Sequence, residues 1–254
     1  MGTLYLVRHG QASFGADDYD NLSELGHRQS LRLGEYWRDK GLKFDAVLVG
    51  TLKRHAQTLA GILKGMQSGQ FSNGPPLGSG SATEPKLAPS GGSAAHAVAS
   101  VGAPLEWAGL NEYDSAAVIA AIHPGKLQKP DTPELYRHHF RILRDGLTQW
   151  MNGVVSPKGM PSYTEFSKGI TSALDHVRSN SQGNVLLVSS GGPISTAVGH
   201  VLGTTPETTI ELNLRIRNTS VTEFSFTPKR HMLVTYNTLP HLDHEDHASW
   251  VTYA

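Results

Sequence analysis

The first 65 residues alternate between short apolar runs and longer segments that suit helices. Residues 3–8 and 44–50 are apolar without strict alternation, as in strands buried on both faces of a parallel sheet. Residues 23–41 and 52–65 read as helices, the first with leucine and aromatic side chains on one face. This succession of strand, helix, strand and helix predicts an α/β layered fold with a parallel sheet.

Residues 66–104 interrupt the pattern. They are rich in Gly, Ser, Ala and Pro and nearly free of large side chains, so they can bury little apolar area. We interpret them as a surface insertion in a single domain that spans residues 1–254, because the downstream sequence completes the same sheet. A flexible linker between two domains is the alternative. Beyond the insertion the pattern predicts helices at 115–122, 132–152, 162–179 and 191–203, a buried strand at 184–190, and an antiparallel pair at 219–227 and 231–237.

The chain turns polar and rich in histidine from about residue 240. The stretch "HLDHEDH" has imidazoles and carboxylates that can bind zinc or nickel adventitiously. No ordered scaffold is evident around it, so we expect a solvated polar tail rather than a metal site.

Composition narrows the class of protein. Lysine and arginine number 22, as do aspartate and glutamate, so no net field steers the chain to nucleic acid or to an anionic membrane. The absence of cysteine excludes disulfides, thiol catalysis and thiolate metal sites. The chain starts without a basic region or a long apolar core, and no apolar run approaches bilayer length. We therefore expect a cytoplasmic protein without a signal peptide.

Candidate chemistry lies at the ends of two predicted strands. Arg8 and His9 end the first run, and Ser189, Ser190 and Gly191 end the run in "VLLVSSGGP". Ligands of open α/β sheets bind beyond the carboxyl ends of the strands. Each run is followed by glycine, and the second opens directly into a predicted helix whose N–H groups can bind an anion. If the two strands are neighbours, the two stretches face each other across one crevice.

Five motifs in this order resemble those of the histidine phosphatase superfamily, the phosphoglycerate mutase-like fold: "LYLVRHG", "LSELGHRQ", "TLKRHAQT", "LNE" and "VLLVSSGG". The resemblance covers most of the chain except residues 66–104 and the tail. It implies a three-layer α/β/α fold with a mostly parallel central sheet. It also implies that His9 is a nucleophile that becomes phosphohistidine, that Arg8 and Arg54 bind the phosphoryl group, and that Glu112 donates a proton.

The residue types suit this chemistry. A neutral imidazole attacks phosphorus through one nitrogen when the other donates to a carbonyl oxygen, which fixes the tautomer. Two guanidiniums give planar, bidentate donors to phosphoryl oxygens and remain charged. A carboxylic acid with a raised pKa protonates the leaving oxygen and then serves as a base towards water. Because the arginines supply the positive charge, we expect no metal and no cofactor.

The main departure from the family pattern is Ser190, which stands where the family usually has a histidine that contacts the phosphoryl group. Serine keeps a donor and an acceptor but loses the positive charge that a histidine can carry, and another histidine, which the sequence does not identify, can fill the space. Gln11 and Ser13 follow "RHG" closely, and we predict that both bind phosphate together with Ser190 and Gly191. The two residues beside Arg54, Lys53 and His55, are expected to be solvated or peripheral.

These features predict a hydrolase for a small phosphorylated metabolite or a phosphoprotein. Mutases of this family carry an "F-x-G-W" segment after "RHG", whereas this chain reads "FGADDYDNLS", so a phosphatase is favoured. Phosphoglycerate-mutase-type transfer is one alternative. A catalytically weakened protein that binds a phosphorylated ligand is the other, and the serine at position 190 motivates it. The sequence does not predict the oligomeric state.

Overall fold

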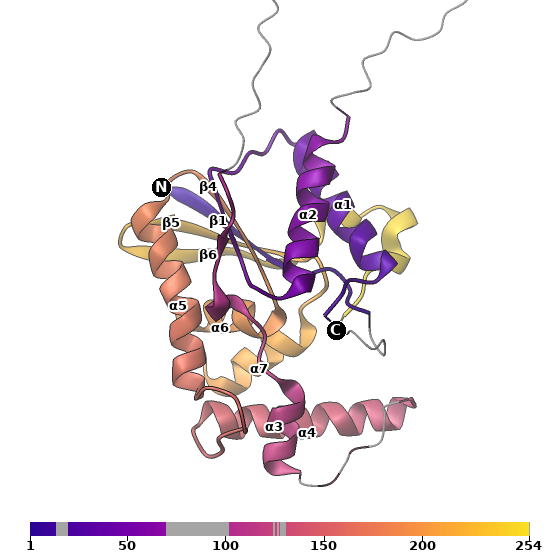
Figure 1. Cartoon of the computed structure of the whole chain (residues 1–254), viewed down its shortest axis with the longest axis vertical. Helices are drawn as coiled ribbons and strands as arrows, with labels where there is room; N and C mark the ends of the chain where they lie inside the picture. The colour runs from indigo at the N-terminus through magenta and orange to yellow at the C-terminus, as the bar shows by residue number, and fades with distance from the viewer. Residues whose placement is uncertain (14–19, 70–101, 124, 126, 128–130, 254) are drawn as a thin grey trace, which may run out of the picture.

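The fold is seen in a computed structural model that describes residues 1–13, 20–69, 102–123, 125, 127 and 131–253. Within these ranges a sheet of six strands lies between helices, as predicted (Figure 1). The strands are β1 (Gly2–Arg8), β2 (Ala46–Val49), β3 (Leu105–Glu106), β4 (Asn184–Ser189), β5 (Val221–Thr227) and β6 (Arg230–Thr238). The helices are α1 (Glu24–Asp39), α2 (Lys53–Gln67), α3 (Ser115–Ile122), α4 (Pro133–Met151), α5 (Tyr163–Asn180), α6 (Gly191–Leu202) and α7 (Pro206–Arg215).

The sheet has the order β3-β2-β4-β1-β5-β6. The first four strands of this order are mutually parallel, and β5 and β6 add an antiparallel edge. Residues far apart in the chain thus pair at its centre, where Leu6 of β1 lies opposite Leu187 of β4. The mostly parallel arrangement agrees with the unbroken apolar runs from which it was predicted.

Two apolar cores cover the two faces of the sheet. Leu4 and Leu6 of β1 point into the core under α3 to α7, whereas Val7 points into the core under α1 and α2. Adjacent residues of β4 divide in the same way, Leu187 to the first core and Leu186 to the second. Successive side chains of a strand point to opposite faces, so a central strand with helices on both sides is apolar at every position.

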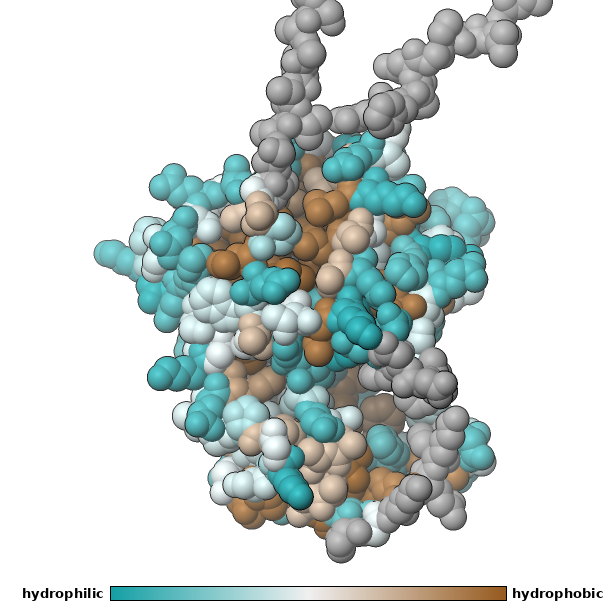
Figure 2. Space-filling model, in the orientation of Figure 1, coloured by the Kyte–Doolittle hydropathy of each residue, from teal (hydrophilic) through white to brown (hydrophobic). Residues whose placement is uncertain are grey.

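The end of the molecule beyond the sheet is formed by α3 and α4, which pack on each other (Figure 1). Apolar side chains reach the surface around α3, where Ala116 and Ala120 are exposed (Figure 2). Among the described residues, no helix combines the length and the apolar character needed to cross a lipid bilayer.

The structure differs from the sequence prediction at several places. No element was assigned to residues 204–218, yet α7 forms there, capped by the Thr205 side chain with proline in its first turn. The helix predicted to close at Gly65 continues to Gln67. Most of the segment 66–104 lies outside the described residues, so its interpretation as an insertion stays a prediction.

The expectation of a solvated tail is wrong in part. His241 is only 1% exposed, and two short 3-10 helices, Pro240–Leu242 and Glu245–Trp250, hold the segment in place. The side-chain nitrogen of Gln29 in α1 donates to the carbonyl oxygen of Trp250 over 2.6 Å and to the Thr252 hydroxyl over 2.9 Å. These contacts bury the segment against α1, although the acidic stretch 243–246 is exposed.

Two glycines set how closely α1 and α2 approach each other. A Cβ on Gly34 of α1 would lie 2.0 Å from the carbonyl oxygen of Ile62, and a Cβ on Gly65 of α2 would lie 2.2 Å from that of Leu31. Both neighbours are backbone atoms, which cannot move aside without shifting a helix. The contact therefore requires residues without a side chain at these two positions.

Gly34→Ala tests this contact through the sign of its effect. Helix propensity alone favours alanine by about 1 kcal/mol. Overpacking costs about 1–3 kcal/mol, so we expect a net loss in the free energy of unfolding measured by urea denaturation. Ala60→Gly, on the exposed face of α2, is the control and should lose only the propensity contribution. A Gly34→Ala variant more stable than the wild type would contradict the close approach.

Candidate active site

The carboxyl ends of β1 and β4 form the floor of the candidate site. Arg8 lies opposite Ser189 in the parallel register, and the backbone N–H of His9 donates to the Ser189 carbonyl oxygen over 2.8 Å. His9 and Ser190 therefore leave neighbouring strands at the same edge of the sheet. This confirms the sequence prediction that the two stretches face each other.

His9 is held in one tautomer. Its Nδ1 lies 2.7 Å from the carbonyl oxygen of Gly10, and because a carbonyl oxygen only accepts, Nδ1 carries the proton. Nε2 is thereby left with its lone pair. The side chain is 4% exposed, and burial, followed by the positive charges of Arg8 and Arg54, holds the pKa of His9 well below 6.5. The ring is a neutral base with one nitrogen available.

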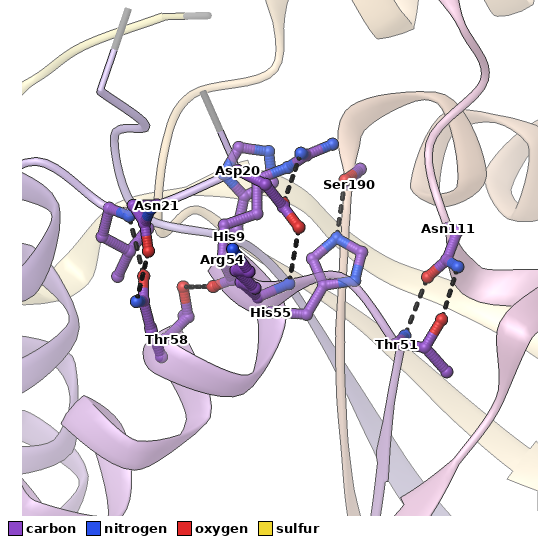
Figure 3. Close-up of polar contacts among 12 residues, drawn as sticks. His9, Asp20, Asn21, Thr51, Arg54, His55, Thr58, Asn111 and Ser190 are labelled. Carbon is purple, nitrogen blue, oxygen red and sulfur yellow. Dashed lines mark hydrogen bonds and ion pairs between the residues drawn. The ribbon is translucent and has the colours of Figure 1, made fainter. Parts of the chain in front are cut away.

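Two buried guanidiniums lie beside this ring. Nη1 of Arg8 donates to the Ile216 carbonyl oxygen over 2.5 Å, which anchors the side chain from the segment after α7. Nη1 of Arg54, at the start of α2, forms an ion pair with Asp20 over 2.8 Å (Figure 3). The other carboxylate oxygen of Asp20 accepts from the backbone N–H of Lys53. Asp20 is a site residue that the sequence analysis did not propose.

Glu112 meets the N-terminus of α6. Its two carboxylate oxygens lie 3.1 and 3.2 Å from the backbone nitrogen of Gly192, which donates to them. Burial raises the pKa of this carboxyl above its usual 4.5, opposed by the Gly192 hydrogen bond and by the charges of Arg8 and Arg54. The same guanidiniums thus act on both His9 and Glu112, which places the four predicted catalytic residues in one cluster.

The other two acids of this region take different roles. Oδ1 of Asp114 accepts from the backbone N–H groups of Ala116 and Ala117 and so caps α3. Glu106 is exposed on β3. Neither shares the hydrogen bonds that place Glu112 beside the arginines.

A second histidine closes the site. His55 and Ser190 are both fully buried, and Nε2 of His55 lies 2.7 Å from the Ser190 hydroxyl oxygen (Figure 3). The ring centroids of His55 and His9 are 5.8 Å apart. The expectation that His55 is solvated or peripheral is therefore wrong, whereas its neighbour Lys53 is exposed as expected.

The burial of His55 can be predicted from the helical periodicity of α2. His55 shares one helical face with Thr58, Leu59 and Ile62, at spacings of three, four and seven residues, and all four are buried. Extending the apolar face back by one turn predicts that the imidazole is buried. Space for it comes from Gly50, where a Cβ would lie 2.2 Å from Nδ1 of His55.

The structure also locates the residues predicted to bind phosphate. The side-chain oxygen of Gln11 accepts from the Ser23 hydroxyl over 2.8 Å, so it is bonded to the start of α1. Ser13 donates its backbone N–H to the carbonyl oxygen of Asn21. Gly191 begins α6 against Asn213, with no room for a Cβ. Phosphate contacts by Gln11, Ser13, Ser190 and Gly191 stay predictions.

Side chains from α2 and the loops fix the framework around these groups. The Thr58 hydroxyl accepts from the backbone N–H of Gly10 over 3.0 Å and donates to the Arg54 carbonyl oxygen over 2.7 Å. Thr51 and Asn111 exchange two hydrogen bonds, which tie the Glu112 loop to the start of α2 (Figure 3). These bonds hold the turn after β1 and the Glu112 loop against the same helix.

The arrangement combines a lone pair for attack, positive charge and a proton source. The free nitrogen of His9 adjoins two guanidiniums that suit the oxygens of a phosphoryl group. A carboxyl whose pKa is raised by burial can deliver a proton to a leaving group. Among the described residues, no three His, Asp or Glu side chains are grouped to hold a metal ion.

Comparison with known proteins shows relatives among phosphatases and mutases. A broad-specificity phosphatase of Saccharomyces cerevisiae is 34% identical over 67 residues, a match that spans 24% of this chain and 29% of the yeast protein. A phosphoserine phosphatase variant from Entamoeba histolytica, solved with phosphoserine, matches with a TM-score of 0.57, 17% identity and coverage of 95% of this chain and 100% of that one. A phosphoglycerate mutase from Bacillus anthracis matches with a TM-score of 0.58, 18% identity and 94% coverage of both chains.

These likenesses to solved structures show a shared fold. The family model described as the histidine phosphatase superfamily, branch 1, matches residues 4–71 and 117–239. The matched ranges contain His9, Arg54 and Ser190 and cover well over half of the sequence. The chain therefore belongs to the histidine phosphatase superfamily.

Proposed function

We propose that this protein hydrolyses phosphomonoesters through a phosphohistidine at His9, and that its substrate is a small phosphorylated metabolite or a phosphoprotein. The hydrogen bond from Nδ1 of His9 to the Gly10 carbonyl oxygen carries this proposal. It keeps the proton away from Nε2 and leaves a nucleophile between two guanidiniums. A site that only binds anions needs no deprotonated nitrogen at that place.

The reaction follows from the groups present. Nε2 of His9 attacks phosphorus while the bond from phosphorus to the ester oxygen breaks, and Glu112 gives its proton to that oxygen, so the alcohol leaves. Arg8 and Arg54 stabilise the charge on the remaining phosphoryl oxygens. Water then attacks the phosphohistidine and yields its proton to the Glu112 carboxylate. Phosphate departs, and both His9 and the acid return to their initial protonation states.

Hydrolysis is favoured over mutase transfer by the sequence after "RHG", most of which lies outside the described residues. The yeast relative, a broad-specificity phosphatase, supports the same choice. Incubation with p-nitrophenyl phosphate and with bisphosphoglycerate separates the two activities, because only a phosphatase releases inorganic phosphate from both. Mutase turnover without release of phosphate would overturn the proposal.

His9→Ala tests the nucleophile. The variant has no nitrogen to attack phosphorus, so we expect turnover of p-nitrophenyl phosphate to fall by about 10³-fold or more. Incubation with a phosphomonoester that carries radioactive phosphorus should give an acid-labile, base-stable phosphoenzyme in the wild type and none in the variant.

His27→Ala is the matched control, because His27 is exposed on α1 and makes no contact with the site. It should label and turn over like the wild type. A label that persists in His9→Ala, or one that survives acid, contradicts phosphohistidine at this position.

Glu112→Gln tests the proton donor through the leaving group. For an alkyl phosphate, whose oxygen must be protonated to leave, we expect kcat/KM to fall by about 10²–10⁴-fold. For p-nitrophenyl phosphate the loss should be much smaller, since p-nitrophenolate leaves without a proton. Asp114→Asn, a change at the neighbouring acid that caps α3, should reduce stability slightly and keep this ratio. Equal losses for both substrates would contradict the role of Glu112.

The pH dependence of kcat/KM follows from the two pKa shifts. The pKa of His9 lies well below 6.5, so activity should persist as the pH falls through 6.5. The pKa of Glu112 is raised above 4.5, so its proton is retained at higher pH than in an ordinary glutamate and is lost on an alkaline limb. After correction for ionisation of the substrate, Glu112→Gln should remove that limb. A limb unchanged in the variant would assign it to another group.

A further inference from the structure

The His55–Ser190 pair is a buried polar unit that the proposed reaction does not use. His55 comes from the first turn of α2 and Ser190 from the turn between β4 and α6, 135 residues later. Both side chains are 0% exposed, and 2.7 Å separate the ring nitrogen Nε2 from the hydroxyl oxygen. Burying an imidazole and a hydroxyl is costly unless each is hydrogen-bonded.

The Ser190 side chain does not cap the helix that it precedes. Ser190 is the residue before α6, where serine ordinarily accepts a hydrogen bond from the backbone of the first helical turn. Its side chain makes no such bond and is turned to His55 instead. The N-terminus of α6 meets the carboxylate of Glu112 through Gly192, so Ser190 is bonded away from the helix that it precedes.

The pair lies beside the reacting atoms. His55 follows Arg54 directly in α2, and its ring centroid is 5.8 Å from that of His9 (Figure 3). Ser190 follows the residue whose carbonyl oxygen accepts from the backbone of His9. Arg54, which directly precedes His55 in α2, lowers the pKa of His9. The pair and the two arginines therefore both adjoin the ring of His9.

We propose that the Ser190 hydroxyl donates a hydrogen bond to the phosphoryl group and that His55 is the positioning residue which directs this hydroxyl. The inference rests on the proposed function, because it assigns the pair to the phosphate pocket of that reaction. The phosphoryl oxygens of a dianionic phosphomonoester carry no proton and only accept, so the single hydroxyl proton of Ser190 must point to them. The hydroxyl oxygen then accepts from Nε2–H of His55, and no proton is transferred.

The lowered pKa of His55 agrees with a neutral imidazole that donates to Ser190. Burial and the charge of Arg54 lower the pKa of His55 to about 3, with the Gly50 backbone opposing part of the shift. The titratable or charged groups shown to face the pair are His9, which directly follows β1, and Arg54 from α2. In this pocket the arginines carry the positive charge, and the pair adds a hydrogen bond without adding a third cation.

The first test uses Ser190→Ala and His55→Gln with p-nitrophenyl phosphate. Removing a single donor to a developing oxyanion costs about 10²–10³-fold, so kcat/KM of Ser190→Ala should fall by about this factor. The side-chain amide of glutamine reaches the place of Nε2 and donates from it, so His55→Gln should stay within about tenfold of the wild type. His55→Ala should lose as much as Ser190→Ala.

The double variants distinguish two roles of His55: orienting the Ser190 hydroxyl, or only filling space in the core. If the two side chains act as one donor, His55→Ala with Ser190→Ala should lose no more than either change alone. His55→Ala with Ser190→His returns an imidazole to the pocket from the end of β4 and should recover about tenfold over His55→Ala. Independent, multiplying losses together with no recovery would overturn the inference.

His241→Gln is the matched control. His241 is also a buried imidazole, 1% exposed, with its Nε2 3.0 Å from a hydroxyl oxygen, that of Thr219. Its replacement should lower the melting temperature and keep kcat/KM within about threefold of the wild type. A loss equal to that of His55→Ala would show that any buried histidine of this fold supports activity in the same way, which overturns the assignment.

Binding of inorganic phosphate, measured by calorimetry, keeps this inference distinct from the proposed function. If the wild type neither turns over substrate nor becomes labelled, the proposed function fails. The affinities for inorganic phosphate then still test whether Ser190 contacts the phosphoryl group. Weaker binding in Ser190→Ala than in the wild type supports the contact, and equal affinity overturns it. If the wild type is active and Ser190→Ala is equally active, the inference fails while the function stands.

Discussion

The parallel pairing of β1 with β4 is the constraint on which the site depends. It sets Arg8 opposite Ser189, so that the two turns beyond these residues leave the sheet side by side. One turn carries the imidazole of His9, and the other leads into α6, whose first turn meets Glu112. A slip of one residue in this register would send every side chain of the strand to the opposite face. The cores on both sides of β1 therefore fix the position of His9.

Burial and positive charge act in the same direction on the pKa of His9 and in opposite directions on the pKa of Glu112. Burial, followed by the charges of the two guanidiniums, lowers the pKa of His9, whereas burial raises the pKa of Glu112 against the effect of the same charges. The result is a base and an acid that coexist without exchanging a proton. The shifts require no exceptional side chains, only the burial of these groups at the carboxyl end of the central strands together with the two arginine charges.

The sequence was sufficient for most of the fold because the central strands β1, β2 and β4 are apolar on both faces and most of the described helices begin at a capping side chain. The order of the motifs suggested His9, Arg8, Arg54 and Glu112 as catalytic residues, and the structure brings these four residues together. The sequence did not locate Asp20, since one carboxylate in a polar loop has no pattern to distinguish it. It misjudged His55, because the residue type suggested a surface position although the helical face predicted burial.

The hydrogen-bond partners of individual side chains could not be predicted from the sequence. Nothing local indicates that Ser190 bonds to a side chain 135 residues earlier in the chain, or that the Gln11 side chain turns to the start of α1. The segment after residue 240 shows the same limit, because the burial of His241 depends on contacts with distant parts of the chain. Such contacts are set by tertiary packing rather than by neighbouring residues.

The position of β1 in the middle of the sheet has a consequence for the order of folding. Its hydrogen-bonding partners are β4 and β5, which begin at Asn184 and Val221. Until the ribosome has released those strands, β1 has two unpaired edges and His9 has no neighbour to set its backbone. A nascent chain therefore carries His9 without the groups that surround it in the folded protein, and the candidate site forms only when the sheet closes around its first strand.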